Sequence, residues 1–425
     1  MHLRNMALVL CLATGLNGQT IDGEWVVKLK FFDNTEYRRM TLHLQDAKLT
    51  GKAGDLELEG TLRGGKVEIQ GKNEGGGKAT LSGALKNGQM SGEATWRGEK
   101  MQWTASRPKP RPAGAAVRHV FEPKEFHRLF SGSIPPVLTL YPGDSVKTWS
   151  VDAGGWDAAG VRRSLGGNPE TGPFYIEGAL PGDTLVVRFE RIRLNRDTAI
   201  SSGSIAGTAL NPYYLSNLKK VEKYDSNWRL DRDKGVAMLA NPTAKLKNYT
   251  VPLHPMLGCI GVAPPGDMVF RSGFLGAFGG NMDYNQMREG VTVYLPVFQP
   301  GALLFIGDGH AAQGDGELTG NALETSMDIE FTVDVIRDRS PGGPRVENKE
   351  YLMAMGIAGS LTEALQEATT SLARWIERDY GLNPAEVSSV LGTAMRYDIA
   401  EVVDPYVNVV AKIGKQALSH VTKAP

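Results

Sequence analysis

The chain has 425 residues, enough for about two or three domains, and carries 47 Lys and Arg residues against 47 Asp and Glu residues. This zero net charge argues against binding to nucleic acid or to an anionic membrane, because both require a basic surface. Hydrophobic residues make up 41% of the chain and charged residues 22%, which indicates a folded protein and excludes a disordered one.

Residues 1–18 have the pattern of a secretory signal. Arg4 is followed by an apolar run from Met6 to Leu16, and small residues that suit cleavage come next. The run is too short for stable insertion in a membrane, since a spanning helix needs about 20 apolar residues. We therefore expect a secreted or periplasmic protein. The alternative for this segment is a short N-terminal strand.

Residues 19–106 predict a small all-β domain. Short segments with alternating apolar residues follow one another at intervals of about 8–12 residues, separated by Gly and Asn turns. This pattern is typical of a small antiparallel barrel or sandwich. The domain could dock a partner, hold a ligand or be a structural appendage. Residues 107–116 follow as a Pro-rich linker, since alternating prolines favour an extended chain.

Residues 117–425 predict a second, larger domain. Apolar strands dominate up to about residue 340, and the turn sequence Pro-Gly-Asp precedes two of them, at residues 142–144 and 181–183. Residues 361–379 have helical periodicity, and Asn383 followed by Pro384 opens a second helix. The expected class is mainly β with a helical C-terminal part.

The densest polar segment is Gly307–Glu317, which contains Asp308 and His310 and is followed by Glu324. We expect an apolar strand to end at Ile306 and this segment to form a glycine-rich loop. Carboxylates and a histidine this close together suit a cation such as zinc or calcium. The alternative is a solvated acidic turn.

A second candidate segment contains Gly279, Gly280, Asn281 and Asp283. The glycines could form a cradle of backbone N–H groups and present Asn281 and Asp283 to the same cavity. Gly-Gly-Asn is also an ordinary turn sequence. The segment alone therefore leaves both interpretations open.

Four further residues are single candidates for a site, each outside these two segments. Asp152 follows a predicted strand, as a site acid often does. Glu177 lies in an apolar strand and could be a general base or part of a buried ion pair. His254, between two prolines, could line the site or simply pack. Cys259 lies in an apolar run without a neighbouring base, which favours buried packing over a nucleophilic role.

Several segments of the larger domain form one set: Pro135–Asp144, Asn168–Pro173, Glu177–Leu185, Gly258–Pro264, Gly279–Asp283 and Gly307–Glu317. In their order and spacing, from about residue 130 to the C-terminus, these segments closely resemble the acetamidase/formamidase family.

The resemblance implies hydrolysis of short aliphatic amides, such as formamide or acetamide, to a carboxylate and ammonia. It also implies a β-sandwich with an α+β region, a divalent metal and a homo-oligomer. Carried over to this chain, the expected metal ligands are Asp152, Asp283, His310 and Glu324. Zinc is preferred over calcium.

Our mechanistic hypothesis is a metal-activated water that attacks the amide carbonyl. Glu177 would relay a proton and Asn281 would share in catalysis, while Gly279, Gly280 and His254 would bind the substrate. Two alternatives remain. One is a non-catalytic periplasmic β protein that binds a metal or ligand, and the other is a hydrolase of a larger C–N substrate.

Overall fold

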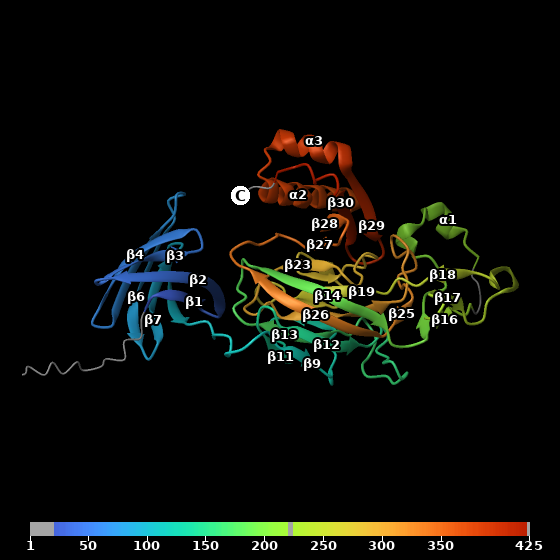
Figure 1. Ribbon diagram of the computed structural model, residues 1–425, viewed down its shortest axis with the longest axis horizontal. Coiled ribbons are helices and arrows are strands. Elements are labelled where there is room, and N and C mark those ends of the chain that lie inside the picture. The colour runs from blue at the N-terminus through green and yellow to red at the C-terminus, as the bar shows by residue number, and fades with distance from the viewer. Residues whose placement is uncertain (1–20, 220–223, 423–425) are drawn as a thin grey trace, which may run out of the picture. The chain divides into compact units, whose positions relative to one another are not determined.

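The computed structural model describes residues 21–219 and 224–422. The predicted signal peptide, residues 1–18, lies outside these described residues. The chain divides into two compact units, Met1–Pro108 and Lys109–Pro425. In Figure 1 the strands of the first unit are blue.

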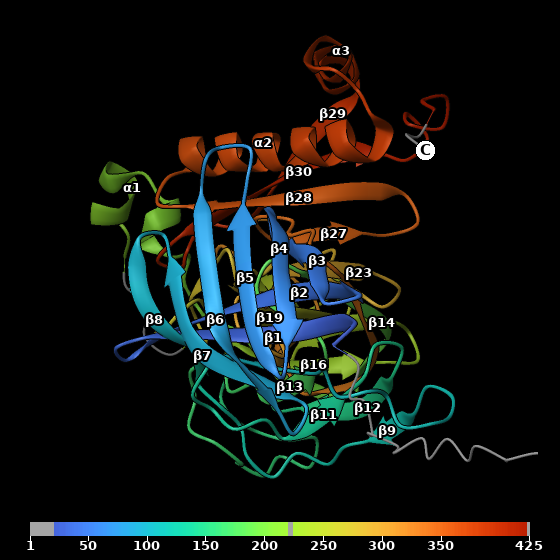
Figure 2. The same ribbon diagram turned by 90° about the vertical axis from the view of Figure 1, so that its left-hand side faces the viewer.

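Eight antiparallel strands of the first unit form a closed barrel (Figure 2). Each strand pairs with the next along the chain, and β1 pairs with β8 to close the barrel. Of the two architectures left open by the sequence, the structure has the barrel. The strands are β1 (Gly23–Phe31), β2 (Asn34–Gln45), β3 (Lys48–Ala53), β4 (Leu56–Arg63), β5 (Lys66–Lys72), β6 (Lys78–Lys86), β7 (Gln89–Trp96) and β8 (Glu99–Ser106).

The alternating sequence pattern fills the barrel with apolar side chains. On β1, for example, Trp25, Val27 and Leu29 are buried while the residues between them are more exposed. Some inner positions are glycines because the next strand comes too close for a side chain. A Cβ at Gly51 would lie 1.9 Å from the carbonyl oxygen of Thr41. Such close approaches allow the strands to coil tightly enough to close a small barrel.

The second unit contains two large sheets. The first has nine strands, with β14 and β26 near its middle. In spatial order its strands are β29 (Met395–Glu401), β30 (Val407–Gly414), β28 (Tyr351–Ala358), β27 (Arg345–Glu347), β23 (Thr292–Pro296), β14 (Thr184–Leu194), β26 (Met327–Ile336), β12 (Ser145–Ser150) and β9 (Arg118–Val120).

The second sheet has eleven strands, and its central strands β19 and β24 are buried along their whole length. Its main path is β18 (Thr250–Pro252), β17 (Val236–Leu239), β16 (Asn227–Asp231), β15 (Thr198–Ile200), β25 (Glu324–Thr325), β24 (Leu304–His310), β19 (Met256–Val262), β22 (Gly279–Asn281) and β21 (Leu275–Gly276). Strand β13 (Thr171–Ile176) also pairs with β24, and β11 (Leu138–Leu140) pairs with β13. A separate pair consists of β10 (Leu129–Ser131) and β20 (Val269–Arg271).

One apolar core joins the two sheets into a sandwich. Phe331 on β26 of the first sheet contacts Phe174 on β13 of the second, with 5.3 Å between ring centroids. Both side chains belong to a single buried cluster that draws on strands of both sheets. The predicted fold class, a small β domain followed by a β-sandwich with an α+β region, is confirmed.

Two helices near the C-terminus cover the end of the nine-stranded sheet. Helix α2 (Leu361–Tyr380) packs on β28 and β30, and α3 (Pro384–Ala394) follows it (Figure 1). Ser360 caps α2, and Gly381 ends it in the left-handed conformation. The buried stripe of α2 is Ala364, Ala368, Leu372, Trp375 and Ile376. The spacing of apolar residues in the sequence also assigns Leu361 and Leu365 to the buried face of this helix, but they lie outside the stripe and are 46% and 41% exposed.

Three short helical segments complete the fold, namely α1 (Pro212–Ser216), η1 (Gly207–Ala209) and η2 (Ala244–Leu246). Across the described ranges, no helix combines the length and apolar character needed to cross a bilayer.

Two arginines of the predicted Pro-rich linker, Arg107 and Arg111, make specific contacts. Arg107 stacks on Trp25 of the barrel, with its guanidinium carbon 4.0 Å from the ring centroid. Arg111 belongs to the second unit, where its guanidinium contacts Asp144 at 3.0 Å and the carbonyl oxygen of Pro142 at 2.5 Å. The segment is therefore ordered by specific contacts within each unit.

The two Pro-Gly-Asp sequences form matching turns. Asp144 donates its backbone N–H to the carbonyl of Tyr141, and Gly143 has φ 91°, as position three of a type II turn requires. The Asp144 carboxylate then accepts the backbone N–H groups of Tyr141 and Val117, both at 2.8 Å. Burial opposes ionisation, yet these bonds together with Arg111 lower the pKa of Asp144.

We predict that Asp144→Asn lowers the free energy of unfolding of the second unit by about 1–3 kcal/mol at pH 7, because a buried charged acceptor is lost. A carboxyl with a lowered folded pKa contributes its stability above the unfolded pKa of about 3.9 and loses it as the pH falls through the folded pKa. The difference from wild type should therefore shrink below about pH 4.

Urea unfolding at several pH values measures this difference. Asp267 is the matched control, because it follows Pro265-Gly266 but is exposed. An equal loss in Asp267→Asn, or a loss that does not depend on pH, would contradict the assignment.

Candidate metal-binding and catalytic site

A buried cluster of acidic side chains surrounds His310 in the eleven-stranded sheet. Asp308 and His310 lie on β24, Glu324 lies on β25, and Asp283 follows β22. The strand register places His310 directly opposite Glu324. Strand β19 runs between β24 and β22, so Asp283 reaches the cluster from across β19.

Strand β24 extends further than the sequence suggested. We expected it to end at Ile306 and to be followed by a loop, but the strand continues through Asp308 to His310. Asp308 has φ 55°, a conformation that Asp adopts more readily than most residues. The register with β19 is the same on both sides of Asp308. The polar residues are therefore held by a central strand.

Two glycines provide the space that the acidic side chains occupy. A Cβ at Gly258 on β19 would lie 2.3 Å from Asp283 Oδ1 and 2.7 Å from Asp308 Oδ2. A Cβ at Gly307 on β24 would lie 2.4 Å from Glu170 Oε2. Any side chain at either position would displace a carboxylate of the cluster.

His310 faces different groups with its two ring nitrogens. Its Nε2 lies 3.2 Å from Glu324 Oε2 and 3.4 Å from Asp308 Oδ2. Its Nδ1 lies 2.9 Å from Gln313 Oε1 and 3.9 Å from Asp283 Oδ1. The imidazole therefore has an acid on either side.

Gln313 fixes the tautomer of His310. The Gln313 amide nitrogen donates to the carbonyl oxygens of Asp283, at 2.5 Å, and Ala400, at 3.3 Å. Its oxygen must then be the atom that faces His310, so Nδ1 carries the hydrogen. In the neutral ring the lone pair consequently lies on Nε2, which points at Asp308 and Glu324.

Four more acids that were not predicted as site residues surround this group: Glu170, Glu317, Glu401 and Asp404. Glu317 lies in the polar segment recognised from the sequence, but nothing there distinguished it from its neighbours. Glu170 directly precedes β13 and lies beside Cys259, which is fully buried as expected. These acids become neighbours only through the tertiary fold.

Burial raises the pKa values of the clustered acids. It is the largest cause for Asp283 and Glu170, whose pKa values lie well above the ordinary range. It also raises the pKa to about 9 for Glu317, to about 7 for Glu324 and to about 6 for Asp404. No Lys or Arg of the described chain forms an ion pair with these carboxylates. Ionisation of these acids is therefore costly unless a cation is close to them. Although burial opposes it, the carboxylates of Glu324 and Asp308 raise the pKa of His310, which leaves the imidazole as the cation nearest to them.

The geometry fits a bound metal ion. Asp308, His310 and Glu324 offer ligand atoms within 4.8 Å of one another, as do Asp283, His310 and Glu317. Four buried atoms in these residues lack a hydrogen-bond partner: Asp283 Oδ1, Asp308 Oδ1, His310 Nε2 and Glu324 Oε2. A cation would satisfy these atoms and neutralise the excess charge.

Two of the expected site residues have other polar partners. Asp152 forms an ion pair with Arg196, with 2.6 Å between Oδ2 and Nη2, so its carboxylate already has a cation. Glu177 follows β13 and accepts the backbone N–H of Lys109 at 3.3 Å. It lies at the opposite end of that strand from Glu170, roughly 20 Å away at about 3.3 Å per residue.

The expected N–H cradle is also replaced by sheet pairing. Gly279 and Gly280 lie on β22, which pairs with β19 on one side and β21 on the other. Asn281 does reach the cluster. Its amide nitrogen donates to Asp283 at 2.5 Å and to Asp404 at 2.7 Å, and its oxygen accepts from Asn168 at 2.8 Å.

A cavity of about 510 Å³ opens beside the cluster. Gln313 and Glu317 line it, and so does the exposed His254. Trp228 and Tyr249 form an aromatic wall, with their rings 6.3 Å apart. The cavity therefore combines polar groups next to the acidic cluster with an apolar wall.

Residues 277–414 match the Acetamidase/Formamidase family, which confirms the resemblance noted from the sequence. The matched segment includes Asp283, His310, Glu317 and Glu324, but not Glu170. An acetamidase of Mycolicibacterium smegmatis is 29% identical over 151 residues, which are 33% of this chain. That match spans only 34% of the length of the relative.

Two crystal structures share the fold. One is a predicted acetamidase/formamidase from Thermoanaerobacter tengcongensis, with 26% identity and a TM-score of 0.62. The match covers 72% of this chain and 99% of the other chain. The other is an acetamidase from Yersinia enterocolitica, with 29% identity and a TM-score of 0.62. The match covers 72% of this chain and 95% of the other chain.

We predict that Asp308→Asn loses bound metal while Asp152→Asn keeps it, because Asp308 faces His310 Nε2 whereas the carboxylate of Asp152 pairs with Arg196. The loss of affinity should exceed the roughly 10–100-fold that removal of an outer hydrogen bond costs. Elemental analysis of protein dialysed against a limiting concentration of zinc measures the difference. Equal metal content in the two variants would contradict this choice of ligand.

Proposed function

We propose that this chain hydrolyses linear amides to a carboxylate and ammonia, using a water molecule activated by a metal held by Asp308, His310 and Glu324. The observation that carries the proposal is the fixed His310 ring, whose Nε2 lies between two carboxylates and has no other partner. The enzyme class is that of the named relatives, hydrolases of non-peptide C–N bonds.

The donor set supports zinc as the metal. Zinc accepts imidazole nitrogen and carboxylate oxygen as ligands, whereas calcium takes six to eight oxygens. A divalent metal bound here would polarise the amide carbonyl and lower the pKa of a bound water. Asp283, on the Nδ1 side of the ring, has a buried oxygen without a hydrogen-bond partner that a nearby cation would stabilise in its ionised form.

Glu317 is the residue that we assign to proton transfer, in place of Glu177. Its carboxyl belongs to the buried cluster and also lines the cavity, so it can reach a substrate. Burial raises its pKa to about 9, which keeps a proton available at neutral pH. Glu317 would give a proton to the departing nitrogen as the C–N bond breaks, and would recover one from the water molecule that enters for the next turnover.

Two residues keep this arrangement in place. Gln313 holds the His310 ring through Nδ1, and Asn281 holds the carboxylates of Asp283 and Asp404 together. Asn281 thus acts by positioning other groups. These bonds fix the cluster before a substrate arrives, as electrostatic catalysis requires.

The cavity favours substrates larger than formamide. Its volume of about 510 Å³ lies in the range of sites for much larger ligands. The wall of Trp228 and Tyr249 would contact an apolar acyl group. Short aliphatic amides remain substrates in this proposal, with the acyl group as the part that gains from the wall.

Export and a homo-oligomeric state are also part of the proposal. The sequence pattern of residues 1–18 supports export to the periplasm or the medium. The family resemblance supports the oligomer.

We predict that the purified protein releases ammonia from amides and that a chelator abolishes this activity. Across formamide, acetamide, propionamide and phenylacetamide, kcat/KM should rise, since each buried methylene contributes about 0.8 kcal/mol, or about fourfold. Ammonia release with and without a chelator measures both effects. Silence on all four amides with metal bound would overturn the proposal. A preference for formamide would overturn only the role of the aromatic wall.

We predict that Glu317→Gln reduces kcat by about 10²–10⁴-fold, because it removes the proton-transfer group. Glu177→Gln is the matched control and should keep wild-type activity, since its side chain meets Lys109 instead. Metal content should be measured for both variants. Wild-type turnover in Glu317→Gln with metal retained would remove Glu317 from this role.

A further inference from the structure

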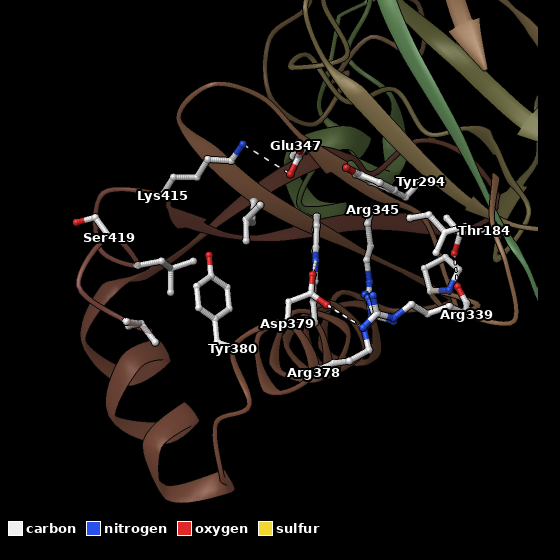
Figure 3. A pocket seen from close by; sticks show the side chains of 16 residues that line it. Thr184, Tyr294, Arg339, Arg345, Glu347, Arg378, Asp379, Tyr380, Lys415 and Ser419 are labelled. Carbon is white, nitrogen blue, oxygen red and sulfur yellow. Dashed lines mark hydrogen bonds and ion pairs between the residues drawn. The ribbon is translucent and has the colours of Figure 1, made fainter. Parts of the chain in front are cut away.

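A second cavity of about 600 Å³ lies beside the C-terminal end of α2 (Figure 3). Its walls come from the last turn of α2, strands β23 and β27, and the segment after β30. It shares no lining residue with the acidic cluster or with the cavity beside it. A ligand bound in this cavity would therefore contact a separate set of side chains.

Arg345 on β27 is a buried cation with one unsatisfied end. Only 4% of the residue is exposed. Its Nε and Nη2 donate to Ser371, at 3.3 Å to the hydroxyl and 3.1 Å to the carbonyl oxygen. Its guanidinium carbon lies 5.2 Å from the centroid of the Trp375 ring. Its Nη1 has no hydrogen-bond partner.

The two acids that line the cavity are already engaged by other groups. Asp379 contacts Arg378 at 3.0 Å and Arg339 at 3.8 Å, and it accepts the indole N–H of Trp375 at 2.9 Å. Glu347 contacts Lys415 at 3.6 Å. Within the described chain, Arg345 has no carboxylate in an ion pair of its own.

The charge of the lining favours an anion. Arg339, Arg345, Arg378 and Lys415 carry four positive charges against the two negative charges of Asp379 and Glu347. Burial, with Arg378 nearby, lowers the pKa of Arg345 to about 10, in keeping with a cation that lacks a counter-charge. A dianion would also meet the repulsion of the two acids.

The remaining walls suit an apolar body. Tyr294, Tyr380 and Leu418 line the cavity together with the Trp375 ring. In Figure 3 the Arg345 side chain extends into the cavity between Tyr294 and Asp379. A buried donor at one end and aromatic walls around it are typical of sites for small organic acids.

We propose that this cavity binds an organic monocarboxylate, whose carboxylate accepts hydrogen bonds from Arg345 Nη1 and whose apolar body packs against Tyr380 and Leu418. The carboxylate supplies the partner that the buried guanidinium lacks. The site is separate from the acidic cluster and does not rest on the proposed amide hydrolysis.

Benzoate is the probe, and isothermal titration calorimetry of the full chain at pH 7 measures its binding. Arg345→Gln should weaken benzoate binding at least tenfold. Ser419 is exposed at the cavity, so Ser419→Glu adds repulsion without disturbing the core and should also weaken binding. Ser388→Glu makes the same change on an exposed face of α3 and should bind like wild type.

Benzyl alcohol and inorganic phosphate complete the test. Both should bind at least tenfold more weakly than benzoate, since one lacks the charge and the other lacks the apolar body. Wild-type benzoate affinity in both Arg345→Gln and Ser419→Glu would place binding elsewhere, including at the acidic cluster, and would overturn the proposal. So would no benzoate binding, or tighter binding of phosphate.

Discussion

The second unit is organised around an electrostatic constraint. Several carboxylates are buried beside one histidine, and no Lys or Arg among the described residues forms an ion pair with them. Asp283, Asp308 and Glu324 all lie within reach of His310, and all are almost completely buried. Such a group is costly unless its members are protonated, hydrogen-bonded or bound to a cation. Asn281 donates a hydrogen bond to the carboxylate of Asp283, and Asn168 donates one to the carboxylate of Asp308. These bonds meet part of this need, and a metal ion would meet the rest.

The sheet is built to meet this constraint. The site acids and the histidine lie on or next to adjacent strands of one sheet, where pairing fixes their relative positions to the precision that a metal site requires. Gly258 and Gly307 leave open the volume that their own side chains would fill. The glycines of these apolar strands thus serve the site, and packing alone would not explain them.

The sequence predicts the fold well because periodicity and turn chemistry are local. Alternation reveals the barrel strands, and Pro-Gly-Asp reveals the turn at Asp144. The site is predicted only in part, since residue type points to Asp283, His310 and Glu324 but not to their neighbours. Asp152 and Glu170 are both acids beside strands, and only the fold gives one an arginine and brings the other to the cluster.

The closure of the N-terminal barrel has a consequence for how that unit can meet other molecules. Because β1 pairs with β8, every strand has two neighbours and the sheet has no edge. A partner cannot add a strand of its own to such a sheet, nor can two copies associate edge to edge. Recognition by this unit must therefore use side chains on its outer surface and the turns at its ends, which can vary in sequence without changing the barrel.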